Sequence, residues 1–510
     1  MIENAINSKI QLDLSDPTMT WLHRAGMAGL WMTLKQLEQL YPIPQKRPGS
    51  LTWLLTPRTI SLYWESEDFS VLDWLLKQSF QISNEGLIKL TALNFVELDL
   101  QTQIIIHLGI TGTFLQHNQF FKSAGKESIS LAVNGVKLVD EYQKAASYAH
   151  QHFAKKLCTK DGQLLQEPIG IAGWLYPGAV VRHYAFKAQT KFQEKPEHAL
   201  ALLFAPVACQ YFILRSHTQA TTKQYALVIP EVNDLEVYSA RFSNLGDLSC
   251  KHFYVSSLGD AGLRFLSYEI ARELVQQHKL QRCQVISFRN VTWSKQQKTR
   301  TEVALVEANE EVQLHYKLVI SCFPEYEVFK HSSGNFIITS MCQCIIADNL
   351  ANSLPWWSNF YALTKTKNSF KQIFHEKEGI CKMIQNFEWN INEYKLFIET
   401  CHEALKVIYA KIYSKTKEDE YAQIERENTR IISQLGRCTN AATFREFISR
   451  LWGRAGHLST LEEHWEELLP VTTGMIDWKI ARDLTIIAIA SYPIKRNKNA
   501  QNLKQEPTKA

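Results

Sequence analysis

Cationic, aromatic and amide side chains gather in three stretches that contain no aspartate or glutamate, at 100–126, 168–193 and 274–301. Cations neutralise phosphates, aromatic rings stack on bases, and planar amides can pair with base edges. Together the stretches predict a nucleic-acid interface, although each one alone is equally compatible with an ordinary solvated surface. The predicted contacts to the nucleic-acid backbone are Lys122, Lys126, Arg182, His183, Lys187, Lys191, Lys295, Lys298 and Arg300.

Base reading is assigned to Gln116, His117 and Asn118, because two of them carry an amide that offers both a donor and an acceptor. Gly112 and Gly125 lie on either side of the three and would let the backbone approach a groove closely. The alternative is a polar loop whose amides cap their own backbone.

The segment 294–300 is expected to be a polar turn between two strands. Lys295, Lys298 and Arg300 would then project into solvent and contact phosphates rather than bases.

A second basic face is predicted near the C-terminus. Arg450 and Arg454 are one helical turn apart, and Arg437 and Arg445 are close to them in the sequence. These four arginines could bind a nucleic-acid strand. They could equally form salt bridges within the protein, because glutamates crowd the following segment, 462–467.

Sequence signatures of catalysis, metal binding and cofactor binding are not found. The pairs His150/His152 and Cys342/Cys344 lack further ligands at the spacing of a zinc site. No nucleotide-binding loop, nucleophile elbow or carboxylate cluster is present. The sequence therefore favours a binding protein with no catalytic residue, metal or cofactor. Two alternatives stay open: a nuclease with an unrecognised histidine-based site, and a protein scaffold that binds no nucleic acid.

The elements that must position these residues differ between two parts of the chain. Residues 1–355 are expected to form an irregular α+β domain for nucleic-acid recognition and subunit docking. Strands are expected at 61–64, 103–107, 211–214, 225–229, 285–293, 301–306, 316–323 and 335–346, and helices at 18–40, 131–156 and 260–278.

Residues 356–492 are expected to form an all-α bundle, because no proline occurs between Trp356 and Leu469. Apolar residues there step by three and four, which is typical of a buried helix face. The first face comprises Ile391, Tyr394, Ile398, Cys401, Leu405, Ile408 and Ile412, and the second Phe444, Phe447, Ile448, Leu451 and Trp452. A basic, disordered tail is expected at 493–510.

Composition limits the class of protein. The chain has 510 residues, 45% of them hydrophobic, which is enough for more than one sizeable core. The formal net charge is only +5, so a polyanion site must come from local clustering of cations. Ten scattered cysteines, no secretory signal and no long apolar run favour a reduced, cytoplasmic protein without a membrane partner.

Three segments carry a family resemblance: 14–30 (LSDPTMTWLHRAGMAGL), 112–117 (GTFLQH) and 175–183 (LYPGAVVRH). With them, the chain resembles the large subunit of the type I CRISPR effector complex (Cascade), in the Myxan or type I-B branch. The resemblance implies a non-catalytic subunit that binds the 5′ handle of the guide RNA (crRNA). It also implies that this subunit reads the short motif (PAM) flanking the target in double-stranded DNA and helps to open the duplex.

The bundle resembles the small subunit of the same complex, which holds the displaced strand of the R-loop. The implied partners are the backbone, handle-binding and small subunits. The complex would hand its target either to a helicase-nuclease, for antiviral defence, or to transposition proteins, for RNA-guided transposition. The sequence leaves open which role applies, and whether an internal start at Met341 or Met383 yields a separate small subunit.

Overall fold

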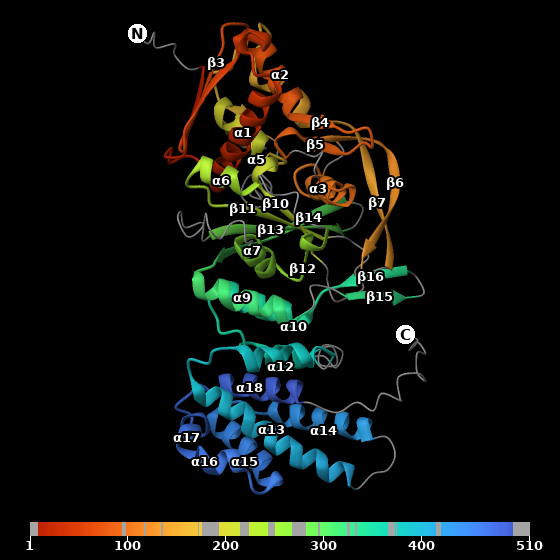
Figure 1. Ribbon diagram of the computed structural model, residues 1–510, viewed down its shortest axis with the longest axis vertical. Helices are drawn as coiled ribbons and strands as arrows, with labels where there is room; N and C mark the ends of the chain where they lie inside the picture. The colour runs from red at the N-terminus through yellow and green to blue at the C-terminus, as the bar shows by residue number, and fades with distance from the viewer. Residues whose placement is uncertain are drawn as a thin grey trace. The chain divides into compact units, whose positions relative to one another are not determined.

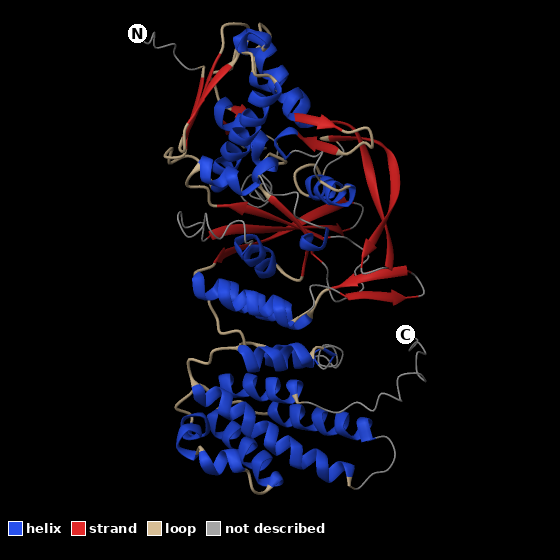
Figure 2. Cartoon of the chain, viewed as in Figure 1, coloured by secondary structure: helices blue, strands red, loops and turns tan. Residues whose placement is uncertain are grey.

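The computed structural model describes residues 9–93, 98–116, 119–133, 136–171, 173–175, 193–214, 224–242, 250–267, 282–293, 296–323, 327–331, 334–365, 373, 375–414 and 420–492. The chain forms two compact units. The first comprises Met1–Ile320 and Pro324–Leu354, and the second Ser321–Phe323 and Pro355–Ala510. The first unit mixes strands and helices, whereas the described part of the second is helical (Figure 2), so the α+β fold class is confirmed.

Nine α-helices are described before residue 355 (Figure 1). They are α1 (Trp21–Leu40), α2 (Asp68–Ser79), α3 (Leu100–Gly112), α4 (Ala154–Leu157), α5 (Pro196–Ala208), α6 (Leu235–Phe242), α7 (Leu258–Ser267), α9 (Glu310–Cys322) and α10 (Met341–Ala351). Short 3-10 helices occur at Pro44–Lys46, Pro48–Ser50, Thr91–Leu93, Ala149–His152 and Cys250–Phe253.

The strands of the first unit form one larger sheet and several small ones. The five-stranded sheet has the order β12 (Tyr254–Val255), β10 (Gln210–Leu214), β11 (Gln224–Pro230), β13 (Arg282–Trp293) and β14 (Gln296–Glu307). A three-stranded antiparallel sheet has the order β1 (Ile10–Asp13), β3 (Thr59–Tyr63) and β2 (Thr52–Leu55). Two-stranded sheets pair β4 (Phe80–Ile82) with β5 (Ile88–Leu90), β6 (Phe121–Val133) with β7 (Val136–Tyr148), β8 (Ile169–Gly170) with β9 (Gln193–Glu194), and β15 (Glu327–His331) with β16 (Gly334–Ile338).

Helices α1 and α5 of the first unit approach each other closely. A Cβ atom at Gly26 would lie 2.0 Å from the carbonyl oxygen of Ala201, and one at Gly29 would lie 2.1 Å from that of Phe204. The two glycines of α1 therefore let the backbones of the helices touch. Every residue of α5 from His198 to Ala208 is buried, so the longest apolar run of the sequence is a core helix.

Several predicted elements are wrong. Residues 131–156, expected to be a helix, form the end of β6, all of β7 and short helical turns. Residues 103–107 and 316–322, expected to belong to strands, lie in helices α3 and α9. The expected strand 335–346 ends at Ile338, before α10. The physical reason in the last three cases is that a short apolar run fits a buried helix as well as a strand.

Side-chain caps begin these three helices. Asp99 Oδ1 accepts from Thr102 N at 2.6 Å, Asn309 Oδ1 from Val312 N at 2.8 Å, and Ser340 Oγ from Gln343 N at 2.9 Å. Each cap satisfies a backbone N–H that the first turn of a helix leaves without a partner.

The second unit is a bundle of α-helices preceded by a 3-10 helix at Phe360–Lys365. Its helices are α12 (Lys377–Asn386), α13 (Asn392–Tyr413), α14 (Glu420–Leu435), α15 (Ala441–Ala455), α16 (Ser459–Glu463), α17 (Trp465–Thr473) and α18 (Trp478–Ser491). The predicted apolar face of α13 is buried from Tyr394 to Ile408, whereas Ile391 is 41% exposed just before the helix. All five residues of the second face are buried in α15, as predicted.

Tryptophans fill the core at the start of the second unit. Trp356 is 1% exposed and packs edge-on against Trp357 and Phe387, and Trp357 stacks on Trp389 with ring centroids 5.1 Å apart. None of the helices in the described residues is long and apolar enough to cross a membrane.

Candidate functional site

The β6–β7 ribbon carries two of the predicted phosphate contacts. Among the described strands, β6 and β7 pair only with each other (Figure 1). Every residue from Lys122 to Ser128 is exposed. Lys144 forms an ion pair with Glu127, whereas Lys122 and Lys126 form none with the side chains that the structure describes. The ribbon therefore presents two exposed cations that are not neutralised by described carboxylates.

The backbone of β6 is irregular next to these lysines. The pairing register shifts between Lys122 and Lys126, and Gly125 has a φ of +118° in this bulge. Only glycine adopts such a conformation readily. Glycine is therefore favoured at position 125 by the backbone conformation of the bulge. Packing does not require it, because a Cβ atom there would meet nothing within 4 Å.

His107 fixes the base of the ribbon to α3. Its Nδ1 accepts from the backbone N–H of Ile88 in β5 at 3.1 Å, and its Nε2 lies 2.8 Å from the carbonyl oxygen of Gln143 in β7. Burial lowers the pKa of His107 to about 4, although the hydrogen bond to Gln143 opposes the shift. Tyr142 packs beside it on Leu87 in a small apolar core. The neutral imidazole is therefore a structural link.

Gln116, one of the three base-reading candidates, uses its side chain within the protein. Its Nε2 donates to the carbonyl oxygen of Gly112 at 2.9 Å, at the end of α3. This is the capping role that was the alternative to base reading. His117 and Asn118 lie outside the described residues.

The strand pairing of β13 and β14 corrects the predicted turn at 294–300. Lys298 and Arg300 are strand residues, paired in register with Val291 and Arg289. The ladder continues to the pair Trp293–Gln296, so residues 296–300 belong to β14 and not to a turn. The prediction was wrong because polar residues at the tip of a long ribbon resemble a loop in composition. Lys295 lies outside the described residues.

The other four predicted backbone contacts of the first unit fall in the segment 182–191. Arg182, His183, Lys187 and Lys191 all lie outside the described residues. Among the described residues before and after this segment, Leu175 and His198 are buried, whereas Gln193 and Lys195 are exposed.

Three of the four bundle arginines are engaged within the bundle. Arg445 donates from Nε to the carbonyl oxygen of Thr472 at 2.9 Å. Arg450 forms an ion pair with Glu446, and Arg454 forms one with Glu427 at 2.6 Å. These contacts are of the internal kind that the sequence left open as an alternative.

Arg437 differs from the other three. It is exposed after α14 and forms no ion pair with any side chain that the structure describes.

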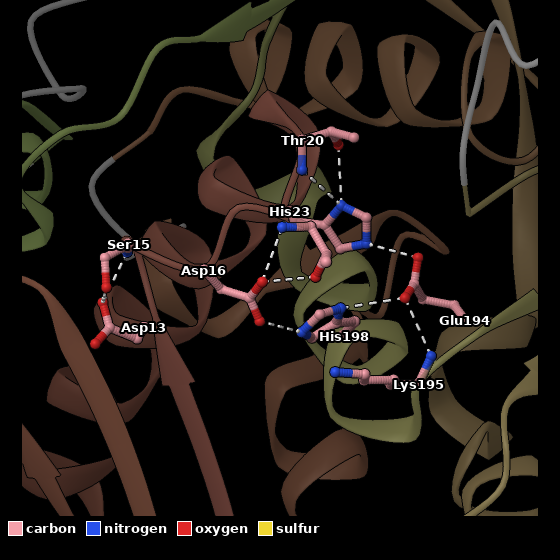
Figure 3. A network of polar contacts seen from close by, with 9 residues as sticks. Asp13, Ser15, Asp16, Thr20, His23, Glu194, Lys195 and His198 are labelled. Atoms are coloured by element: carbon pink, nitrogen blue, oxygen red, sulfur yellow. Dashed lines mark hydrogen bonds and ion pairs between the residues drawn. The ribbon is translucent and has the colours of Figure 1, made fainter.

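A partly buried cluster that the sequence analysis missed joins α1 to the start of α5 (Figure 3). The carboxylate of Glu194 lies between two imidazoles, with Oε2 at 3.2 Å from His23 Nε2 and Oε1 at 3.1 Å from His198 Nδ1. On its other side, the ring of His198 contacts Asp16 Oδ2 through Nε2 at 3.2 Å. The side chains of His23 and His198 are 1% and 5% exposed.

The contacts in this cluster favour the charged forms of His198 and Glu194. Hydrogen bonding to Glu194, opposed by burial, raises the pKa of His198 above its ordinary value. Burial alone would raise the pKa of Glu194, but hydrogen bonds from His198 and His23 outweigh it and hold that pKa well below the ordinary range. The only local sequence signal is the spacing of Glu194 and His198, one helical turn apart at the start of a helix, because His23 is far away in the chain.

Comparison with known proteins identifies two domains. Residues 11–203 match the DevT N-terminal domain family, and residues 385–510 match the DevT C-terminal domain family. The chain is 25% identical to the CRISPR-associated protein Cas8a1/Csx13 of Myxococcus xanthus (strain DK1622) over an alignment of 540 residues. This alignment covers 98% of the present chain and 91% of the relative. The matches to both DevT domain models and to this CRISPR-associated relative confirm the resemblance to the type I CRISPR large subunit.

Proposed function

We propose that this chain is the non-catalytic large subunit of a CRISPR RNA-guided DNA-targeting complex. The observation that carries the proposal is its similarity to Cas8a1/Csx13 from one end of the chain to the other. The subunit would bind the 5′ handle of the guide RNA together with the backbone, handle-binding and small subunits. It would also read the motif that flanks the target, while pairing with the guide reads the target itself.

The β6–β7 ribbon is the part of the described surface that best suits contact with duplex DNA. The major groove of B-DNA admits a two-stranded ribbon, and no third strand in the described part of the chain pairs with this one. Lys122 and Lys126 would contact phosphates, which positions the ribbon but carries no sequence information. His117 and Asn118, which precede the ribbon, remain the proposed base readers, since the amide of Gln116 already caps α3.

The bundle would support the displaced strand of the R-loop. Arg437 is the first residue to test there, because it is exposed, whereas the other three arginines hold carbonyl oxygens or glutamates of the bundle.

The experiment measures binding of duplex DNA by the complex reconstituted with guide RNA, as a function of salt. The double variant Lys122→Ala/Lys126→Ala should weaken binding for every flanking sequence and reduce the salt slope by about two. A matched control, Lys35→Ala/Lys77→Ala, removes the same charge from lysines that are already paired with Glu38 and Asp73.

The control complex should bind as the wild type does. An unchanged salt slope in the ribbon variant, or an equal change in the control, would contradict the assignment of the ribbon. A loss confined to one flanking motif would show that the lysines read bases instead of phosphates.

A further inference from the structure

The cluster around Glu194 has the arrangement of a metal site. One ring nitrogen of His23 and one of His198 approach the same carboxylate, at 3.2 Å and 3.1 Å. Ligand atoms of the three side chains all lie within 4.8 Å of one another. Two atoms that share a tetrahedral zinc ion at about 2.0–2.1 Å are roughly 3.3–3.4 Å apart. Each histidine nitrogen lies slightly closer than this to its own oxygen of Glu194, Oε2 for His23 and Oε1 for His198. Because one ligand atom from each residue lies within 4.8 Å of the other two, small side-chain shifts would bring all three around one ion.

The far side of each imidazole is held by an oxygen. His198 Nε2 lies 3.2 Å from Asp16 Oδ2. His23 Nδ1 lies 2.9 Å from Thr20 Oγ1, and 3.2 Å from the backbone nitrogen of Thr20, whose N–H points toward it. Figure 3 shows both contacts on the ring edges that face away from Glu194. Histidines that bind metal almost always donate their other N–H to such an oxygen, which fixes the tautomer and the ring orientation.

Asp16 is itself held in place. Its Oδ1 accepts from the backbone N–H and the hydroxyl of Thr18, at 2.8 Å and 2.6 Å. The carboxylate that orients His198 therefore belongs to an ordered turn before α1. Such a supported outer contact is expected of a metal site, in which the groups behind the ligands matter almost as much as the ligands.

The net charge of the cluster and its exposure to solvent also suit a divalent cation. Neutral imidazoles with the carboxylates of Glu194 and Asp16 would carry two negative charges, which a divalent ion balances. The side chains of Glu194 and Asp16 are 16% and 27% exposed, so solvent reaches one side of the cluster. Water can thus supply a fourth ligand, as in zinc sites with three protein ligands.

We propose that His23, Glu194 and His198 bind one zinc-type divalent cation, with Asp16 and Thr20 as outer contacts that orient the two histidines. The ion would connect the first turn of α1 to Glu194, just before α5, and to His198 in the first turn of α5. Its role would be to stabilise the first unit, and this inference does not depend on the proposed function.

The test begins with metal analysis of the full-length protein. Protein stripped with a chelator and titrated with Zn²⁺ against a chromophoric competitor should bind one equivalent, and its thermal unfolding temperature should rise. Cobalt-loaded protein should show the visible absorption bands of a tetrahedral complex. The absence of stoichiometric binding in the wild type would overturn the proposal.

Variants locate the site. His198→Gln and Glu194→Gln should each abolish stoichiometric binding and the cobalt bands. Asp16→Asn should keep the stoichiometry but weaken affinity about 10–100-fold, since it disturbs only an outer contact. This variant also keeps the proposal testable if a ligand variant does not fold.

The matched control is His464→Gln in the second unit. His464 Nδ1 lies 3.1 Å from Glu467 Oε2, a histidine–carboxylate pair that belongs to no described three-residue cluster. This variant should bind zinc as the wild type does. Unchanged binding in both His198→Gln and Glu194→Gln would place the ion elsewhere and refute the assignment.

Discussion

Replacing Gly26 by alanine should separate two helices that now touch. The added Cβ would meet the carbonyl oxygen of Ala201 at 2.0 Å, whereas carbon and oxygen atoms in contact lie roughly 3.3–3.6 Å apart. The obstacle is the backbone of α5, which cannot rotate away as a flexible side chain could. Helices α1 and α5 would therefore have to move apart by about 1.3 Å or more, given this contact distance.

The cost can be weighed against the gain in helix propensity. Overpacking a core typically costs about 1–3 kcal/mol, and a rigid backbone obstacle belongs at the upper end. Alanine favours a helix over glycine by about 1 kcal/mol, which offsets part of this cost. We expect Gly26→Ala to lower the free energy of unfolding of the first unit by about 1–2 kcal/mol on these values.

Gly453 in α15 provides the matched control. A Cβ atom there would meet nothing within 4 Å, so only the propensity term remains. Gly453→Ala should raise the free energy of unfolding of the bundle by about 0.5–1 kcal/mol. The same chemical change thus has opposite signs at the two positions.

The assay is urea unfolding of the full chain followed by circular dichroism, with hydrogen exchange to locate the affected helices. Faster exchange should be confined to α1, α5 and their neighbours in Gly26→Ala. If that variant proves as stable as the wild type, or if Gly453→Ala is the more destabilised of the two, the account of the α1–α5 contact is incorrect.

Three further predictions follow from burial, charge and register. The pKa of His107 is about 4 in the fold and 6.5 in its ordinary state, so the unfolded chain takes up a proton first as the pH falls. The free energy of unfolding should therefore fall between pH 6.5 and pH 4, and His107→Gln should remove about 3 kcal/mol of this fall in urea unfolding. Leu405→Asp buries a charge at a fully buried position of α13 and should unfold the bundle in limited proteolysis, whereas the exposed neighbour Lys406→Asp should not. Lys298→Ala/Arg300→Ala should weaken DNA binding equally for all flanking sequences in filter binding; a selective loss would contradict phosphate contact.

The helical bundle could be predicted well from the sequence. The proline-free stretch and the three–four spacing around Leu405 and Phe447 are local signals, and the burial of these residues agrees with them. The expected strand at 103–107 failed because an all-apolar segment has no periodicity to read. Its cap at Asp99 was present in the sequence and would have favoured the helix.

The missed ribbon also had a local signal. An Asn134-Gly135 pair separates β6 from β7, and this dipeptide is typical of two-residue hairpin turns. The expected helix at 131–156 ignored it. Turn chemistry was therefore the better guide than apolar content in this segment.

The His23–Glu194–His198 cluster could not be predicted from sequence spacing. His23 meets the other two residues only because Gly26 and its neighbours let α1 pack directly on α5. Tertiary packing of distant segments creates this cluster. The resemblance segment 14–30 contains both His23 and Gly26, so part of that motif serves the packing of the first unit.

The central claim is that this chain works in a guide-RNA complex, and the most direct measurement is sequencing of the RNA that copurifies with it. The tagged full-length chain would be expressed together with its partner subunits and a repeat–spacer array. We expect RNAs that share one constant 5′ end followed by spacer sequence, retained through a high-salt wash. Recovery of no RNA, or of mixed cellular RNA that salt removes, would contradict the account.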